Sequence, residues 1–194
     1  MHAFSQESLA QLFTDARTHR AWKPLPVEDA TLQRLWEFTQ LGPTSGNCVP
    51  FRVVFVKGAE ARAKLLPCLD AGNVERSRVA PVSAVLAWDL SFPDRMAHQN
   101  PGKDVSWSQG NPELAAKLAK ENGWLQAGYF ILAARALGLD CGPMGGFDAA
   151  RVDAAFLAGT PWRSFMVVNL GHGDGSGLFP RAPRVPFSEG ARVL

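Results

Sequence analysis

One helical segment, residues 112–137, limits what this chain can fold into more than any other feature of the sequence. Asn111 can cap this segment, Pro112 suits a first helical position, and Gly138 suits the residue just past the end. The segment is apolar on more than one side and contains several alanines and glycines. A helix of this kind needs partners around most of its circumference. We therefore predict a long helix that other parts of the fold enclose.

Shorter helices and isolated strands alternate on either side of this helix. The patterns predict a first helix capped by Ser5, further helices over 28–41, 59–69 and 148–157, and strands over 51–56, 82–88, 140–144 and 165–171. The segment 91–110 is a long polar connection, and the tail after Gly171 is an extended arm. This order favours a three-layer α+β fold over a doubly wound sheet, as a single domain over residues 1–194.

Composition excludes several classes of function. The formal net charge of +2 gives no strongly basic face for nucleic acid. The start of the chain has no signal-peptide pattern, and the longest apolar stretch, 129–139, is too short to span a bilayer. The three cysteines and four histidines lack the spacing of a zinc site or a disulfide framework. We expect a cytoplasmic protein with no metal and no nucleic-acid or membrane partner.

Two segments near the N-terminus carry side chains that suit an anionic, planar ligand. The first contains Arg17, Thr18, His19 and Arg20, which together can give charge-assisted hydrogen bonds to a phosphate. The second, residues 42–50, is a tight loop before a strand that exposes backbone amides, a hydroxyl and a carboxamide together, and its Asn47 can pair with the edge of a planar ring. Taken alone, a solvated helix end and ordinary turn chemistry explain these two segments at least as well.

Two more segments lie in the C-terminal half. In residues 142–146, three glycines in five residues allow the backbone to approach a flat ligand closely. The extended arm carries Arg181 and Arg184, which would be ordinary surface charge if they stood alone. Neither 142–146 nor the glycine-rich run 171–177 has G-x-G-x-x-G spacing, so the chain lacks a Rossmann nucleotide site, and it has no Walker A loop.

Together and in this order, these segments resemble the nitroreductase superfamily. That family has an R-R-S-x-R-x-F-like segment, a P-S-S-x-N-x-Q-P-W loop, a long helix ending in G-L-G, a glycine-containing strand end, and G-Y-G-D followed by a basic arm. The matching stretches are 17–22, 43–51, 133–142, 171–174 and 180–186. Finer matches at 13–19, 42–45, 87–89 and 135–144 are similar to the RutE-type branch of malonic semialdehyde reductases.

The resemblance implies a nitroreductase-type fold, with a central, mainly antiparallel sheet flanked by helices, and a homodimer with FMN at the subunit interface. NADPH or NADH would reduce the flavin at N5 in a ping-pong cycle, so no catalytic side chain is expected. The phosphate would bind Arg17, Thr18, His19, Arg20, Arg181 and Arg184. Ser45 and Asn47 of the partner would face the ring, and backbone amides of Met144 and Gly145 would lie near N5.

For the acceptor, the resemblance implies 3-oxopropanoate, reduced to 3-hydroxypropanoate. Its carboxylate needs a cation, for which Arg95, His98 and Lys103 in the 91–110 segment are candidates, although a solvated loop is the simpler interpretation. Ala16 stands where many relatives have the first arginine of the phosphate segment, and Val49 stands at the glutamine position of the loop. A general NAD(P)H nitro or quinone reductase and a non-catalytic flavin-binding sensor remain the alternatives.

Overall fold

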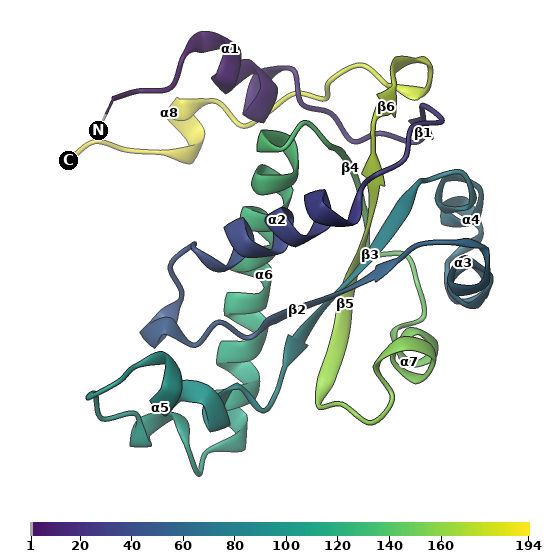
Figure 1. Ribbon diagram of the computed structural model, residues 1–194. Helices are drawn as coiled ribbons and strands as arrows, with labels where there is room; N and C mark the ends of the chain where they lie inside the picture. Colours follow the sequence, from purple (N-terminus) through teal and green to yellow (C-terminus); the bar gives the residue numbers. More distant parts are fainter. Residues whose placement is uncertain (1) are drawn as a thin grey trace.

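A four-stranded antiparallel sheet forms the middle layer of the computed structural model, which describes residues 2–194 (Figure 1). Its strands lie in the order β2–β3–β5–β4. They span β2 Phe51–Val56, β3 Val82–Asp89, β4 Asp140–Met144 and β5 Trp162–Gly171. Every neighbouring pair in this sheet is antiparallel. The four strands predicted from short β-branched and aromatic runs are thus confirmed, with β5 beginning three residues earlier than expected.

Helices α2 Asp29–Gln40 and α6 Pro112–Ala136 cover one face of the sheet (Figure 1). The core between them contains Phe51 and Leu86 of the sheet, Leu35 of α2 and Phe130 of α6, all fully buried. The rings of Phe51 and Phe130 pack with their centroids 5.8 Å apart. The buried residues of α2, Leu32, Leu35 and Thr39, follow a period of about 3.6 residues, the kind of pattern from which the helix over 28–41 is predicted.

The helix α6 begins and ends as its sequence indicates. The Asn111 side chain accepts a hydrogen bond from the Leu114 amide at 3.0 Å, and Gly138 takes a φ of 79° just after the helix. Part of its surface stays open, because Trp124 and Leu125 are each 45% exposed. One chain therefore leaves apolar surface of α6 without a partner.

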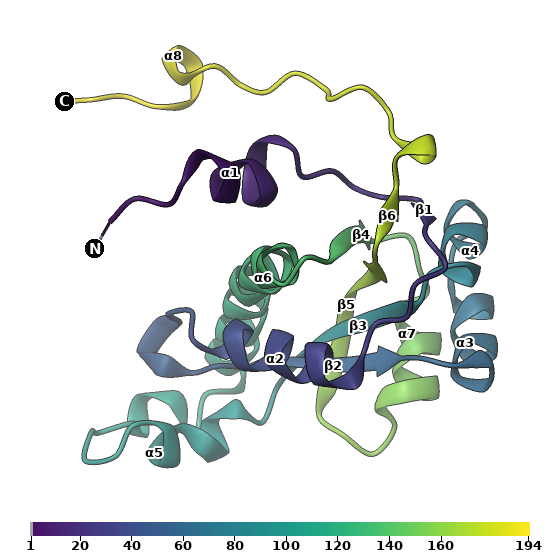
Figure 2. The same ribbon diagram turned by 45° about the horizontal axis from the view of Figure 1, so that its top comes forward.

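A second layer of helices covers the other face of the sheet (Figures 1 and 2). It consists of α3 Ala59–Leu65, α4 Ala71–Arg78 and α7 Ala149–Val152, with short 3₁₀ and π turns after α3 and α7. Leu65, Val85, Val152 and Val167 form its buried core. The three-layer α+β expectation is confirmed, whereas α4, which is polar and short, was missed by the sequence patterns.

The segment 91–110 contains short helical turns, among them α5 Met96–Gln99, in place of an irregular loop. Side-chain hydrogen bonds fasten it to the loop before β2. Asn47 Nδ2 donates to the Gln99 carbonyl at 3.0 Å, and Asn100 Nδ2 donates to the Gly46 carbonyl at 3.1 Å. This segment is therefore a fixed part of the fold beside residues 44–50.

Both ends of the described chain lie on one side of the molecule (Figures 1 and 2). The N-terminal part consists of α1 Gln6–Leu9, a π turn at Ala10–Thr14 and the short strand β1 Ala21–Trp22, which pairs with β6 Gly173–Asp174. Ser5 caps α1 by accepting a hydrogen bond from the Ser8 amide at 3.1 Å. The chain that follows β6 is mostly extended and exposed, as the sequence predicted, and contains two short helical turns, a 3₁₀ turn at Gly175–Gly177 and α8 Phe187–Gly190.

Candidate functional site

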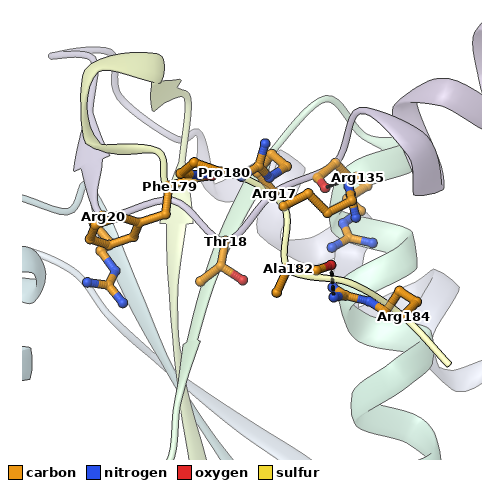
Figure 3. Close-up of a pocket in the computed structure, with 10 residues that line it drawn as sticks. Arg17, Thr18, Arg20, Arg135, Phe179, Pro180, Ala182 and Arg184 are labelled. Carbon is orange, nitrogen blue, oxygen red and sulfur yellow. Dashed lines mark hydrogen bonds between the residues drawn. The ribbon is translucent and has the colours of Figure 1, made fainter.

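A cavity of about 220 Å³ lies where the N-terminal segment, the end of α6 and the C-terminal arm meet (Figure 3). Its lining includes five arginines and no carboxylate: Arg17, Arg20, Arg135, Arg181 and Arg184, together with Ala16, Thr18, Phe179, Pro180 and Ala182. Five guanidiniums around a small space favour an anion of more than one charge. The structure thus brings together five of the six residues predicted to bind a phosphate.

Backbone carbonyls hold these arginines in place. Arg17 donates to the Phe179 carbonyl, and Arg181 Nη2 donates to the carbonyls of Thr14 and Ala16 at 2.7 and 2.8 Å. The Arg20 guanidinium lies 4.6 Å from the centroid of the Phe179 ring. The N-terminal segment and the arm therefore shape the cavity jointly, although more than 150 residues separate them in the sequence.

Sequence reasoning missed Arg135 as a candidate ligand. This residue sits in the last turn of α6, and its Nη1 donates to the Leu12 carbonyl at 2.8 Å. The sequence signal that could have identified Arg135 is a charged residue among alanines near the end of an apolar helix.

His19, also predicted to contact the phosphate, does not line the cavity. Its side chain is buried, and Nε2 lies 3.3 Å from Asp140 Oδ1, while the other oxygen of Asp140 accepts a hydrogen bond from the Gly173 amide at 2.8 Å. The His19 amide donates to the Cys141 carbonyl at 3.0 Å. His19 thus ties the phosphate segment to β4 and to the turn before the arm.

A line of polar groups leads from the cavity toward the glycine-rich end of β4. Arg76 of α4 lies near Arg20: burial lowers the pKa of the Arg76 guanidinium, and the charge of Arg20 lowers this pKa further. Arg76 Nε is buried without a hydrogen-bond partner in the described chain. Arg76 also donates to Asn73, whose Nδ2 donates to the Gly146 carbonyl at 2.6 Å. Because α4 was not predicted, neither of these residues was a candidate.

Met144 and Gly145, the predicted backbone ligands, lie at this strand end. Thr18, which lines the cavity, forms an isolated parallel β-bridge with Cys141 of β4. Gly145 follows Cys141 by four residues, so the strand end lies roughly 13 Å from the cavity along β4. Met144 is buried, but Gly145 is exposed and a Cβ there would meet no heavy atom within 4 Å. The backbone at Gly145 is therefore open to a ligand.

Ser45 and Asn47 lie far from the cavity of their own chain. The Ser45 amide donates to Asn122 Oδ1 of α6 at 2.8 Å, whereas the cavity is lined by Arg135 of the same helix. Thirteen residues of α-helix separate these two positions by roughly 20 Å. The structure thus does not bring Ser45 and Asn47 together with the other predicted ligands within one chain.

Strain is concentrated in the same loop. Asn47 and Val49 are the non-glycine residues with positive φ in the described chain, at 54° and 36°. Such a φ is unusual for a β-branched residue and costs about 1–3 kcal/mol. The surrounding contacts must therefore hold this loop in its shape.

The described residues contain neither a metal-binding cluster nor a membrane-spanning helix. Within residues 2–194, no three His, Cys, Asp or Glu side chains form a group that could hold a metal ion. No helix in this described part of the chain is long and apolar enough to cross a membrane.

The fold and the cavity define a class of protein: a three-layer α+β protein with an arginine-lined cavity next to a glycine-rich strand end. The sequence model described as "Nitroreductase family" matches residues 14–172. The chain belongs to the nitroreductase family.

Relatives similar in sequence extend over nearly the whole chain. A protein of Stutzerimonas stutzeri named "Putative NADH dehydrogenase/NAD(P)H nitroreductase" is 52% identical over 189 residues, 96% of each chain. A protein of Burkholderia lata with the same description is 51% identical over 194 residues, all of both chains.

Solved structures show the same fold at low sequence identity. A nitroreductase family protein from Streptococcus pneumoniae superposes with a TM-score of 0.82 at 18% identity, over 96% of this chain and all of that one. A structure from Exiguobacterium sibiricum, described as a "putative nitroreductase in complex with FMN", gives a TM-score of 0.83 at 17% identity over the full length of both chains. The expected nitroreductase-type fold is thereby confirmed.

Proposed function

We propose that this protein is an FMN-dependent oxidoreductase that takes electrons from NADPH or NADH and reduces a small carboxylated aldehyde such as 3-oxopropanoate. The observation that carries the cofactor assignment is the cavity of five arginines without a carboxylate. The relatives named as NAD(P)H nitroreductases and the FMN complex of the Exiguobacterium protein support this assignment.

The residues present fit FMN along its length. A phosphate monoester carries about −1.5 to −2 charges, which the arginine cavity can neutralise. The buried, unpartnered Nε of Arg76 lies between this cavity and the strand end, where it can donate a hydrogen bond to a ligand oxygen. Exposed backbone at Gly145 suits the close approach of a flat ring. We assign Thr18 and the five cavity arginines to the phosphate, and Asn73 and Arg76 to the middle of the cofactor.

A second copy of the chain completes this site. Ser45 and Asn47 cannot reach the cofactor of their own chain, because roughly 20 Å of α6 separates them from the cavity. One chain leaves apolar surface open that a homodimer interface could bury. It consists of Trp124 and Leu125 on α6 and of Phe179, Val185 and Phe187 in the arm. Such interfaces bury on the order of 2,000 Å² or more.

When bound, FMN supplies the centre that accepts and returns the hydride. The role of the chain is to hold the phosphate, to exclude water from the ring and to place the acceptor beside it. Since donor and acceptor occupy the same position in turn, we expect ping-pong kinetics. Reduction of the aldehyde also places a proton on its carbonyl oxygen, and this proton can come from solvent, so the arrangement requires neither a nucleotide-binding fold nor an acid–base side chain.

An anaerobic visible spectrum of the FMN-saturated protein tests the proposal. We expect the flavin absorbance to bleach when NADPH or NADH is added and to return when 3-oxopropanoate follows. If it returns only with nitro compounds or quinones, the protein is a general nitro or quinone reductase; the names of its relatives include an NAD(P)H nitroreductase. A bound flavin that no nicotinamide cofactor reduces indicates a sensor, and a protein that binds no flavin contradicts the proposal as a whole.

A further inference from the structure

Two arginines share one buried carboxylate at the end of β3. Asp89 is fully buried, and its Oδ2 accepts hydrogen bonds from Arg52 Nη2 at 2.7 Å and from Arg95 Nη1 at 2.9 Å. Its Oδ1 accepts from the amide and the hydroxyl of Ser91 at 2.9 and 2.7 Å. One guanidinium would neutralise this carboxylate, so the second leaves a surplus of one positive charge.

The two arginines differ in their access to solvent. The Arg52 side chain is 10% exposed, whereas that of Arg95 is 51% exposed. Burial lowers the pKa of Arg52; Asp89 opposes this effect, and the charge of Arg95 adds to it. The surplus charge is therefore placed at the surface on Arg95, and an anion bound there would relieve the repulsion between the two guanidiniums.

This network is joined to the strained loop before β2. Arg52 Nη1 donates to the Val49 carbonyl at 3.0 Å, and the turn that follows Arg95 is hydrogen-bonded to Gly46 and Asn47. The Trp107 ring also covers Gly46, where a Cβ would lie 2.6 Å from the ring. Arg95 thus belongs to the same rigid unit as Ser45 and Asn47, the residues assigned to the ring of the partner's cofactor.

We propose that Arg95 binds the carboxylate of the electron acceptor, and that Asp89 and Arg52 are positioning residues that hold its guanidinium. The inference rests on the proposed function and adds the group that selects carboxylated acceptors. Within the described chain, Nη1 is the one guanidinium nitrogen of Arg95 that makes a hydrogen bond. The other N–H groups of Arg95 remain to donate to the two oxygens of a carboxylate. Val49, in the loop joined to this network, has no hydrogen-bonding atoms in its side chain, so the charged side chain of Arg95 is the group suited to recognise a carboxylate.

The other two cations of the segment are less suited to this role. His98 and Lys103 are exposed, and neither makes a side-chain hydrogen bond or an ion pair in the part of the chain that the structure describes. A free lysine loses conformational freedom when it binds an anion, whereas Arg95 is already held by Asp89. Preorganisation therefore favours Arg95.

Matched acceptors with and without a carboxylate test the inference. The FMN-loaded protein is reduced anaerobically with NAD(P)H and mixed in a stopped-flow instrument with 3-oxopropanoate or propanal, and with 4-nitrobenzoate or nitrobenzene. The rate of flavin reoxidation is measured for wild type, Arg95→Ala, Arg95→Lys and Lys120→Ala. Lys120 is an exposed cation of α6 and controls for the loss of one positive charge.

We expect Arg95→Ala to slow reoxidation by the carboxylated acceptors about tenfold or more, and by the uncharged ones less than about twofold. Arg95→Lys should recover part of the rate, and Lys120→Ala should match wild type. Equal losses with charged and uncharged acceptors, or no loss at all, would overturn the inference while leaving the proposed function intact. If NAD(P)H does not reduce the flavin bound to the wild-type protein, the proposed function is wrong, and the inference that rests on it is wrong as well.

Discussion

At the scale of single residues, Arg135 shows how one side chain serves both fold and site. Its Nη1 donates to the Leu12 carbonyl, and its own carbonyl accepts a hydrogen bond from Gln11 Nε2 at 2.6 Å. A cation in the last turn of a helix also interacts favourably with the carbonyl end of α6. Arg135 also lines the arginine cavity. Without its positive charge, the cavity would bind an anion more weakly.

We predict that Arg135→Ala weakens FMN binding about tenfold, because one charge-assisted hydrogen bond to the phosphate is lost. Quenching of flavin fluorescence on titration with the protein measures the dissociation constant. Arg163→Ala is the control, since Arg163 is exposed at the start of β5 and donates only to the adjacent Trp162 carbonyl among the described contacts. Unchanged affinity in Arg135→Ala would remove Arg135 from the site.

At the scale of elements, β4 and the residue directly after it contain two glycines with different surroundings, Gly142 in the strand and Gly145 just past its end. A Cβ at Gly142 would lie 2.6 Å from the His19 carbonyl oxygen, where β4 meets the phosphate segment. A Cβ at Gly145 would meet no heavy atom of the chain within 4 Å. The first glycine therefore serves packing between elements, and the second leaves room for a ligand.

The two alanine variants should separate these roles. Gly142→Ala should lower the free energy of unfolding by about 1–3 kcal/mol, the usual cost of forcing extra volume into a packed contact. Gly145→Ala should leave stability nearly unchanged and weaken FMN binding. Urea unfolding without added FMN gives the first quantity, and flavin titration gives the second. If Gly145→Ala binds FMN as tightly as wild type, the ring does not approach this backbone.

At the scale of the whole molecule, the proposed ligands occupy two separate regions of the chain. The arginine cavity lies at the carboxyl end of α6, and the Ser45–Asn47 loop lies roughly 20 Å away beside Asn122. One chain leaves apolar residues of α6 and of the arm exposed to solvent. A symmetric pair of chains would bring each loop to the other chain's cavity.

Mixed dimers test this arrangement. We expect Arg17→Ala combined with Arg181→Ala to abolish activity, and Ser45→Ala combined with Asn47→Ala to reduce it strongly. In a heterodimer of the two double variants, one site has both sets of wild-type residues and the other has neither. Co-expression with two affinity tags should therefore restore activity to about half of the wild-type value per dimer. A heterodimer no more active than its parents would show that each site is built within one chain.

The sequence by itself determined the elements whose signals are local. The caps around α6, the 3.6-residue period of α2 and the β-branched run of β2 each act within a few residues, so their patterns could be interpreted without the fold. The resemblance in motif order also predicted that the arginines at 17, 20, 181 and 184 act together, and all four line the same cavity; their binding of a phosphate stays a prediction. Helix α4 was missed, because its polar sequence has no apolar period and its burial is decided by the sheet it packs on.

Only the tertiary structure decided which side chains meet. It placed Arg135 in the cavity, turned His19 away toward Asp140, and set Arg76 beside Arg20. It also joined Arg95 to Asp89 and Arg52 at the end of the sheet, which no spacing in the sequence indicates. These contacts depend on the register of β4 against β5 and on the seating of α4 and α6. A local pattern fixes the conformation of a segment, whereas the distance between segments is set by packing of the whole chain.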